Sequence, residues 1–191
     1  MANEFYNHIT KFSDLSALDF RGVMAYFEPI SLEKKGMLQI EGSVSPQKYF
    51  VVSGCLHMFF TDDQGVEKTV FFAMENWWIG DHLNFYKDSP SGFGIQAVET
   101  SEVLGISVAN MNALLKEFPI MERYFRRVYE VGYGAALMRM KYIYDHSKEE
   151  IFIQFRKQFP EFVQRVPQYL LASFLGLTPE YLSKIRGKEL S

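Results

Sequence analysis

Polar and basic side chains gather near the end of the chain, in the stretch VPQYLLASFLGLTPEYLSKIRGKEL. On a helix beginning near Thr178, the residues Tyr181, Leu182 and Ile185 would face inward and the polar residues outward. Carboxylates and hydroxyls can contact base edges in a DNA major groove, whereas Lys and Arg pair with guanine edges or phosphates. The candidate DNA-binding residues are Gln168, Thr178, Pro179, Glu180, Ser183, Lys184, Arg186 and Lys188.

Two short helices must position these side chains. The first is expected over Gln168–Leu175 and ends at Gly176, which tolerates a left-handed backbone. Thr178 can cap the second helix, with Pro179 in its first turn, where a missing N–H costs nothing. The pattern predicts a helix-turn-helix, in which the base contacts fall to Glu180 and Ser183. A terminal helical hairpin that only covers a core has the same pattern.

Composition limits the class of protein. The chain has 191 residues, of which 48% are hydrophobic and 23% charged, enough for a buried core and too apolar for a disordered chain. A single Cys55, no membrane-length apolar run and no leader-like start lead us to expect a cytoplasmic protein. The net charge of −3 argues against a nucleic-acid partner. From Ser147 onward, however, there are seven basic and five acidic residues, which weakens this argument.

The pattern of apolar residues along the sequence predicts an α+β fold. Residues 5–27 carry apolar side chains at helical spacing, and between Glu28 and Ser107 the pattern changes to short β-rich runs punctuated by glycine. The expected strands include 49–52, 55–61 and 69–72, with a turn at 62–65. Short strands with regular turns indicate a small β-barrel or β-roll.

Helices return after Val108, with a short one over Asn110–Glu117 and a long one from Pro119 to His146. Apolar residues repeat along the long helix at alternating spacings of three and four, which predicts a dimerisation seam. The alternative is a helix packed on its own barrel. The seam residues are Met121, Tyr124, Val128, Val131, Ala135, Met138 and Tyr142. A further helix is expected over Ile151–Phe159, and the predicted domains are 1–118, 119–146 and 147–191.

Three stretches in this order resemble the CRP/FNR regulators. Lys48–Leu56 resembles the family's YFVLSG hairpin, Trp78–Asp81 falls where its phosphate-binding cassette begins, and Gln168–Arg186 resembles its helix-turn-helix. The resemblance implies a cyclic-nucleotide-binding-like jelly roll, a long dimer helix and a DNA-binding domain. It also implies a homodimer on a pseudo-palindromic operator, with RNA polymerase as a candidate further partner.

The sequence departs from the family at the cassette and at the end. Asp81 replaces the family's Glu, and no Arg stands near Ser91 or Gly92, so we expect no cyclic AMP binding in the usual manner. The candidate effector-pocket residues are Trp78, Gly80, Asp81, His82, Ser91 and Phe93. These aromatic residues can equally fill a core. The chain stops at Ser191, where the family usually continues into a β-wing, so the wing is expected to be absent.

Other functions find little support in the residues. With one cysteine there is no cluster for an iron–sulfur centre, and His57 and His82 are isolated candidates for haem ligation. A metal-dependent β-roll enzyme would need grouped histidines, and no nucleotide-binding or hydrolase motif is present. We expect no enzyme, metal or cofactor. The remaining alternative is a ligand-binding or dimerisation module whose helix-turn-helix no longer reads DNA.

Overall fold

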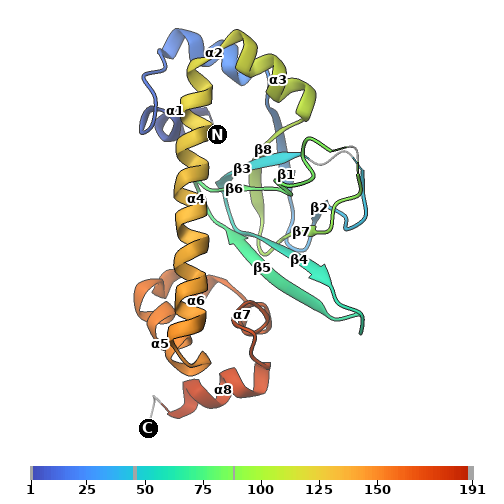
Figure 1. Cartoon of the computed structure of the whole chain (residues 1–191), viewed down its shortest axis with the longest axis vertical. Helices are drawn as coiled ribbons and strands as arrows, with labels where there is room; N and C mark the ends of the chain where they lie inside the picture. The colour runs from blue at the N-terminus through green and yellow to red at the C-terminus, as the bar shows by residue number, and fades with distance from the viewer. Residues whose placement is uncertain (1, 45–46, 88, 189–191) are drawn as a thin grey trace. The chain divides into compact units, whose positions relative to one another are not determined.

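Two four-stranded sheets form the β-roll of the computed structural model, which describes residues 2–44, 47–87 and 89–188 (Figure 1). Their strand orders are β1-β8-β3-β6 and β2-β7-β4-β5, and each pair with an assigned register is antiparallel. The strands are β1 Glu28–Leu32, β2 Met37–Gln39, β3 Lys48–Ser53, β4 Leu56–Thr61, β5 Glu67–Ala73, β6 Trp78–Ile79, β7 Gly94–Ala97 and β8 Ser101–Ile106. The predicted α+β class is therefore confirmed.

Buried apolar strands explain why the roll closes. All residues of β3 except its last are buried, and Tyr49 and Phe50 pair with β8 on one side and β6 on the other. Gly54 then turns the chain at a positive φ of 94°, where a side chain would collide with Ser101. At the β4–β5 turn, Asp62 Oδ1 accepts hydrogen bonds from the N–H groups of Gln64 and Val66. The turn at 62–65 joins β4 and β5, which are neighbours in one sheet, as the sequence predicted, whereas Gly54 carries the chain from β3 in one sheet to β4 in the other.

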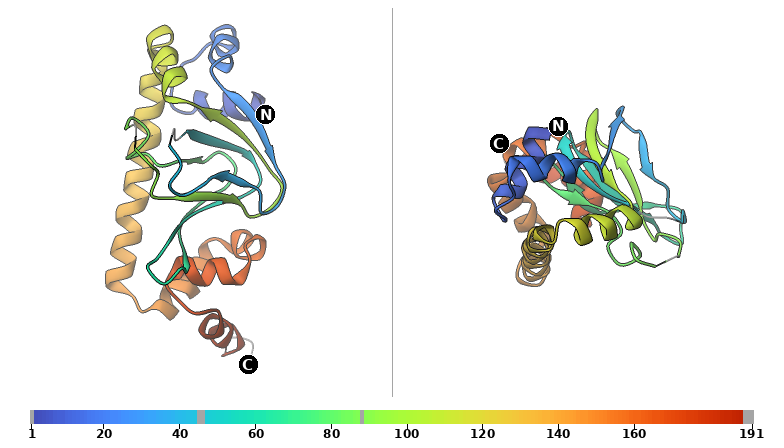
Figure 2. Two further views of the ribbon diagram at one scale, coloured as in Figure 1. Left: turned by 90° about the vertical axis from the view of Figure 1, so that its right-hand side faces the viewer. Right: turned by 90° about the horizontal axis from the view of Figure 1, so that it is seen from above.

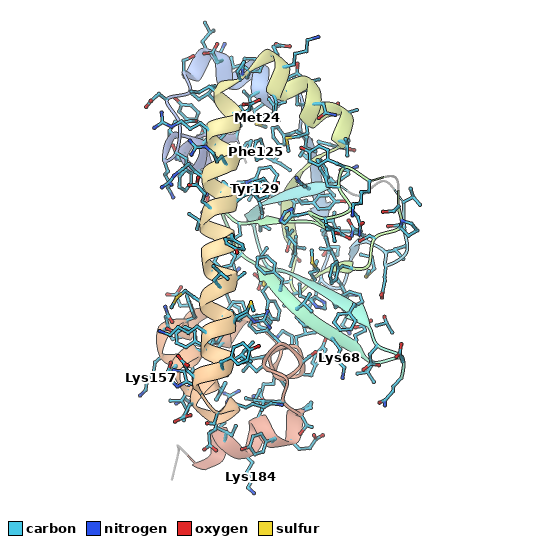
Figure 3. All side chains as sticks on the ribbon, in the orientation of Figure 1. Met24, Lys68, Phe125, Tyr129, Lys157 and Lys184 are labelled. Carbon is cyan, nitrogen blue, oxygen red and sulfur yellow. The ribbon has the colours of Figure 1, made fainter. Side chains whose placement is uncertain are left out.

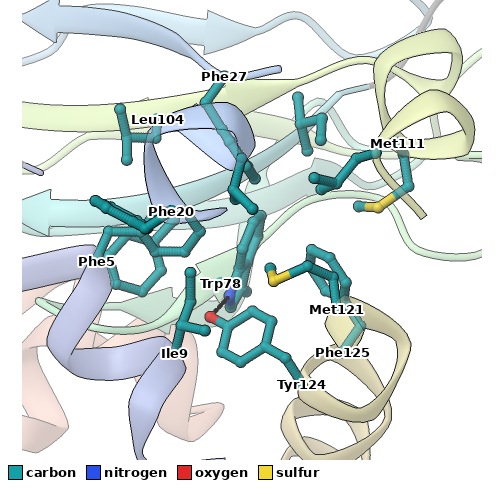
Figure 4. Close-up of a cluster of buried hydrophobic side chains, with 14 of the residues drawn as sticks. Phe5, Ile9, Phe20, Phe27, Trp78, Leu104, Met111, Met121, Tyr124 and Phe125 are labelled. Atoms are coloured by element: carbon teal, nitrogen blue, oxygen red, sulfur yellow. Dashed lines mark hydrogen bonds between the residues drawn. The ribbon is translucent and has the colours of Figure 1, made fainter. Parts of the chain in front are cut away.

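Helices cover one end of the roll, where α2 and α3 lie (Figure 2). They are α1 Ala2–Thr10, α2 Ala17–Met24 and α3 Val108–Glu117, with Ser16 and Ser107 as side-chain N-caps of α2 and α3. The roll, these helices and the first turns of α4 Ile120–Asp145 share one core rich in aromatic rings (Figure 4). Phe5 alone contacts the rings of Phe20, Phe27, Phe50, Trp78 and Tyr124.

The chain divides into two compact units. The first comprises Met1–Phe60 and Phe71–Glu130, and the second Thr61–Val70 and Val131–Ser191, in their described parts. Helix α4 has 26 residues, which corresponds to a length of about 39 Å, and the boundary between the units falls within it. The division into domains 1–118, 119–146 and 147–191 stays a prediction.

The second unit is built on four short helices and the end of α4. These helices are α5 Lys148–Gln158, α6 Pro160–Arg165, α7 Gln168–Leu175 and α8 Pro179–Lys188. The sequence did not predict α6, a single helical stretch of six residues that Pro160 opens. Inside this unit, the Arg139 guanidinium donates hydrogen bonds to the carbonyls of Val70 and Phe174 and lies 4.0 Å over the Phe174 ring. Arg139 therefore holds α4, α7 and the hairpin segment 61–70 together.

The predicted dimerisation seam must be shortened. Met121 and Tyr124 are both 0% exposed within the protein's own core, so these two residues are not available to a second chain, and Val128 is half-buried against the same core. A seam with alternating spacings of three and four suits an intramolecular core as well as a partner helix, which is why the sequence did not separate them. The exposed remainder of the seam is Val131, Ala135, Met138 and Tyr142.

Candidate functional site

The turn between α7 and α8 has the geometry that its residues predict. Gly176 adopts a left-handed backbone at φ 65°, and its N–H bonds back to α7. The N–H of Leu177 donates to the carbonyl of Ala172 at 2.8 Å, which completes a Schellman cap. Thr178 Oγ1 then accepts from the N–H of Tyr181 at 3.2 Å and caps α8. The turn fixes the direction of α8 by local hydrogen bonds.

Helix α8 has one buried face and one exposed face. Leu182 and Ile185 are buried, whereas Glu180, Ser183 and Lys184 are exposed, and the Lys184 side chain extends away from the helix (Figure 3). Tyr181 was expected to face inward with Leu182 and Ile185 and is instead 43% exposed. This placement corrects the predicted inward face.

The other candidate DNA-binding residues lie near this exposed face. Gln168, Thr178 and Pro179 are exposed or half-buried, and Arg186 is half-buried. The side chain of Lys188 and the residues 189–191, on which the predicted absence of a wing depends, lie outside the described residues. All eight candidates thus belong to α7, α8 or the turn between them, and the side chains of seven are described.

A basic hollow that the sequence did not single out adjoins α8. It encloses about 660 Å³, and Arg156, Arg165 and Arg186 contribute its cations. Pro160, Val163, Val166 and Pro167 supply its apolar wall. Arg156 and Arg165 are distant in sequence from α8, and the only sequence pattern pointing to them was the excess of basic residues after Ser147. Three guanidinium groups around one hollow favour anions such as phosphates.

The cassette region of the roll is closed by its own hydrogen bonds. Asp81 Oδ2 accepts from Ser91 Oγ at 2.9 Å, from Asn84 Nδ2 at 2.9 Å and from the Gly92 N–H at 3.3 Å. Gln39 Nε2 donates to Ser91 Oγ and to the Phe93 carbonyl. Burial opposes the charge of Asp81, but the hydrogen bonds from Asn84, Ser91 and Gly92 outweigh it and lower the pKa of this carboxyl.

The polar atoms of the cassette are unsuited to a phosphate. Asp81 is an acceptor with a negative charge, and Gln39 Oε1 is a buried acceptor without a hydrogen-bond partner among the described residues. The space beside Gly94 is taken by the ring of Phe59, 2.6 Å from where a Cβ would stand. A phosphate entering here would meet lone pairs and a ring rather than a cation.

The remaining effector-pocket candidates differ in their surroundings. Trp78 is buried in the aromatic core and donates from Nε1 to Tyr124 Oη, so it is removed from the list of pocket residues (Figure 4). Gly80 packs closely on the backbone at Gln47, where a Cβ would approach the carbonyl oxygen at 2.8 Å. His82 lies with its ring 5.3 Å from that of Tyr129. Hydrogen bonds through Ser91 bring Asp81 and Phe93 together.

The described residues offer no metal site and no membrane span. No group of three or more His, Cys, Asp or Glu side chains gathers in the positions described. Within the same part of the chain, no helix combines the length and apolarity needed to cross a bilayer. His57 bonds to Gln96 and stacks on Phe59, and burial lowers its pKa. These contacts give His57 a packing role.

Part of the chain matches a known domain family. Residues 29–118 match the cyclic nucleotide-binding domain family. This match covers the strands and α3, which are the elements that build the cassette described above. The sequence search against curated proteins gave no match.

Solved structures of similar fold include a protein described as a global regulator. One is the c-di-GMP responsive global regulator CLP of Xanthomonas campestris, with a TM-score of 0.70, 13% identity and 92% of each chain covered. Another is a CooA mutant from Carboxydothermus hydrogenoformans, with a TM-score of 0.68, 18% identity and coverage of 93% and 85%. FixK2 from Bradyrhizobium japonicum follows with a TM-score of 0.67, 13% identity and coverage of 85% and 83%. Identities this low show a shared fold.

Proposed function

We propose that this protein is a sequence-specific DNA-binding transcription regulator that works as a homodimer. The observation that carries the proposal is helix α8, whose Leu182 and Ile185 are buried while Glu180, Ser183 and Lys184 stand exposed behind a Schellman turn. A buried inner face and an exposed outer face behind a tight turn support a helix-turn-helix, in which the second helix enters the major groove. The regulators of similar fold support the same conclusion.

The exposed residues of α8 have distinct roles in this proposal. Glu180 and Ser183, in the first turns, contact base edges, with Glu180 accepting from a cytosine amino group. Lys184 reaches guanine O6 and N7 or a neighbouring phosphate. Arg186, together with Arg156 of the basic hollow, holds the phosphate backbone. The acidic body of the chain contributes little to affinity, so the contacts around α7 and α8 must supply it.

Dimerisation places two copies of α8 on one duplex. Val131 is 58% exposed and Met138 49% exposed, and Ala135 and Tyr142 continue the same face of α4. Pairing of these faces would bury them and set the two α8 helices about 34 Å apart, one turn of DNA. The operator would then be pseudo-palindromic, and RNA polymerase is a candidate further partner.

In-vitro selection from a random DNA pool tests the proposal. The full chain should enrich a pseudo-palindrome with half-sites about ten base pairs apart. Lys184→Ala should lower affinity for the enriched site about tenfold and relax the consensus at one position in each half-site. Lys34→Ala removes the same charge at an exposed residue of the roll and should change affinity less than about twofold. No enrichment at low salt would favour a ligand-binding or dimerisation module.

Salt dependence separates phosphate contacts from base contacts. Because phosphate neutralisation releases counterions, the affinity for the selected site should fall steeply as salt rises. Arg186→Ala should reduce the slope of log affinity against log salt by about one per subunit without changing the consensus. An unchanged slope would remove Arg186 from the interface.

A further inference from the structure

A lysine ammonium is buried inside the first unit without a carboxylate partner. Lys48, the first residue of β3, is 3% exposed. Its Nζ donates a hydrogen bond to Tyr129 Oη at 2.5 Å, and no carboxylate of the described residues lies within ion-pair distance. A buried and unpaired ammonium is costly, so its retention requires a compensating partner.

Aromatic rings supply part of that compensation. Nζ lies 4.0 Å from the ring centroid of Phe85 and 5.0 Å from those of Tyr86 and Tyr129. Ring faces attract a cation but replace only part of the hydration that three N–H donors lose. Burial lowers the pKa of Lys48 to about 8, so the amine remains mostly protonated at pH 7. The ammonium thus keeps donors for an additional acceptor.

A hollow of about 210 Å³ opens beside this ammonium. Its lining combines one buried cation, two phenol groups, an apolar wall and one acidic residue, namely Lys48, Tyr86, Tyr129, Met111, Leu115, Phe125 and Glu122. The side chains of Phe125 and Tyr129 project from α4 toward the roll (Figure 3). The volume is below the range of drug-sized pockets, about 300 Å³ and more, and suits a compound with a single ring.

The neighbouring titratable groups leave Lys48 as the positive charge of the hollow. Although part of His82 reaches solvent, burial of its ring and the nearby ammonium lower its pKa to about 4, so it is neutral at pH 7. Burial raises the pKa values of Tyr86 and Tyr129, which remain hydroxyl donors. Asp81 is engaged with Ser91 and Asn84. Glu122 is exposed to solvent, which screens its charge.

We propose that this hollow is a binding site for a small aromatic carboxylate. The carboxylate pairs with the Lys48 ammonium and accepts from the Tyr129 hydroxyl, while the ring packs on Met111, Leu115 and Phe125. One cation and one hydroxyl match a single negative charge rather than a doubly charged phosphate. The site is separate from the Asp81–Ser91 network, and it stands whether or not the chain binds DNA.

Calorimetry of the full chain with benzoate at pH 7 tests the site. Benzoate should bind saturably, and benzamide, the neutral compound of the same shape, should bind at least about tenfold more weakly. In NMR of lysine side chains, saturation with benzoate should raise the pKa of the Lys48 amine by about one unit or more, because an adjacent carboxylate favours the charged form. Absence of benzoate binding, or equal affinity for benzamide, would overturn the proposal.

Variants assign the binding to this hollow. Lys48→Met keeps the chain length without the charge and should weaken benzoate binding at least about tenfold, with the fold checked by circular dichroism. Tyr129→Phe retains the ring, lacks the hydroxyl and should weaken benzoate binding about threefold. This variant tests the proposal if Lys48→Met does not fold. Glu122→Gln should tighten binding about twofold. Lys87→Met removes an exposed lysine nearby and should leave the affinity unchanged, so a loss in that variant would also contradict the assignment.

Discussion

The Trp78 indole nitrogen donates a hydrogen bond to the Tyr124 hydroxyl at 2.8 Å, and His8 Nδ1 lies 2.8 Å from the same oxygen. Indole N–H can only donate, so Tyr124 Oη accepts from Trp78 and uses its own proton toward His8. All three side chains lie in the core. One hydroxyl therefore joins α1, β6 and the start of α4, three elements that are distant in sequence.

Removing this hydroxyl should destabilise the fold. Tyr124→Phe leaves a buried indole N–H and a buried imidazole nitrogen without partners, which predicts a loss of about 3 kcal/mol in the free energy of unfolding. Urea unfolding at pH 7, followed by tryptophan fluorescence, measures it. Tyr144→Phe changes a residue that is 84% exposed and should stay within about 0.5 kcal/mol of the wild type. Equal stability of both variants would show that the hydrogen bonds contribute nothing net.

The burial of His8 beside Tyr124 predicts a loss of stability in acid. Burial, with a smaller effect of Lys11, lowers the pKa of His8 to about 4 from 6.5. Between these values the unfolded chain binds the proton and the folded chain does not, so stability falls as pH drops from about 6.5 toward 4. The contribution reaches about 3 kcal/mol at the acid end. In urea titrations across this range, the difference in the free energy of unfolding between wild type and His8→Gln should shrink as pH falls. A difference that does not change with pH would contradict this assignment to His8.

The parts of the fold that depend on neighbouring residues could be read from the sequence. Helix α7 occupies Gln168–Leu175 as predicted, because Pro167 can precede a helix and Gly176 ends it by a local backbone preference. The Thr178 cap follows from a hydroxyl three residues before the N–H that it accepts. The turn at 62–65 likewise predicted that β4 and β5 are neighbouring strands.

Features that require distant residues to meet could not be predicted. Lys48 and Tyr129 are separated by 81 positions, and nothing in the type of either residue indicates that they touch. Trp78 was predicted as a pocket residue because aromatic rings suit ligands and cores alike, and only its contacts with Phe50 and Tyr124 assign it to the core. The role of Asp81 in an effector pocket stays a prediction, and its hydrogen bonds to Ser91 and Asn84 were not foreseen.

The left-handed glycine between α7 and α8 gives a prediction with its own control. Gly176→Ala should lower the free energy of unfolding by about 1 kcal/mol through backbone strain, since the added Cβ meets only Lys148 Nζ at 3.7 Å. Gly176→Asn should recover part of the loss because asparagine tolerates this conformation. Gly187→Ala, within helix α8, should not destabilise. Equal stability of Gly176→Ala and Gly176→Asn would contradict the role of the turn.

Calorimetry with cyclic AMP should give no saturable heat. The acceptor atoms of Asp81 and Gln39 occupy the cassette, and no lysine or arginine among the described residues forms an ion pair with Asp81. Gly92 has open space around its Cβ position, so Gly92→Arg can introduce a cation there without a clash. If Gly92→Arg binds cyclic AMP and the wild type does not, the missing positive charge explains why the wild type fails to bind. Micromolar binding by the wild type would refute our interpretation of the cassette.

The exposed face of α4 predicts a dimer that a single charge disrupts. Met138 is 49% exposed on this face, and in a paired helix its side chain would lie against the partner, where an unpaired carboxylate is costly. Met138→Glu should therefore be monomeric in light scattering at concentrations where the wild type is dimeric. Tyr144→Glu places the same charge on α4 two positions beyond Tyr142, away from the seam, and should remain dimeric. Dissociation of both variants, or of neither, would place the contact elsewhere. Loss of the dimer should also lower the affinity for a full pseudo-palindrome to about that for a half-site, because only paired chains hold two α8 helices on one duplex.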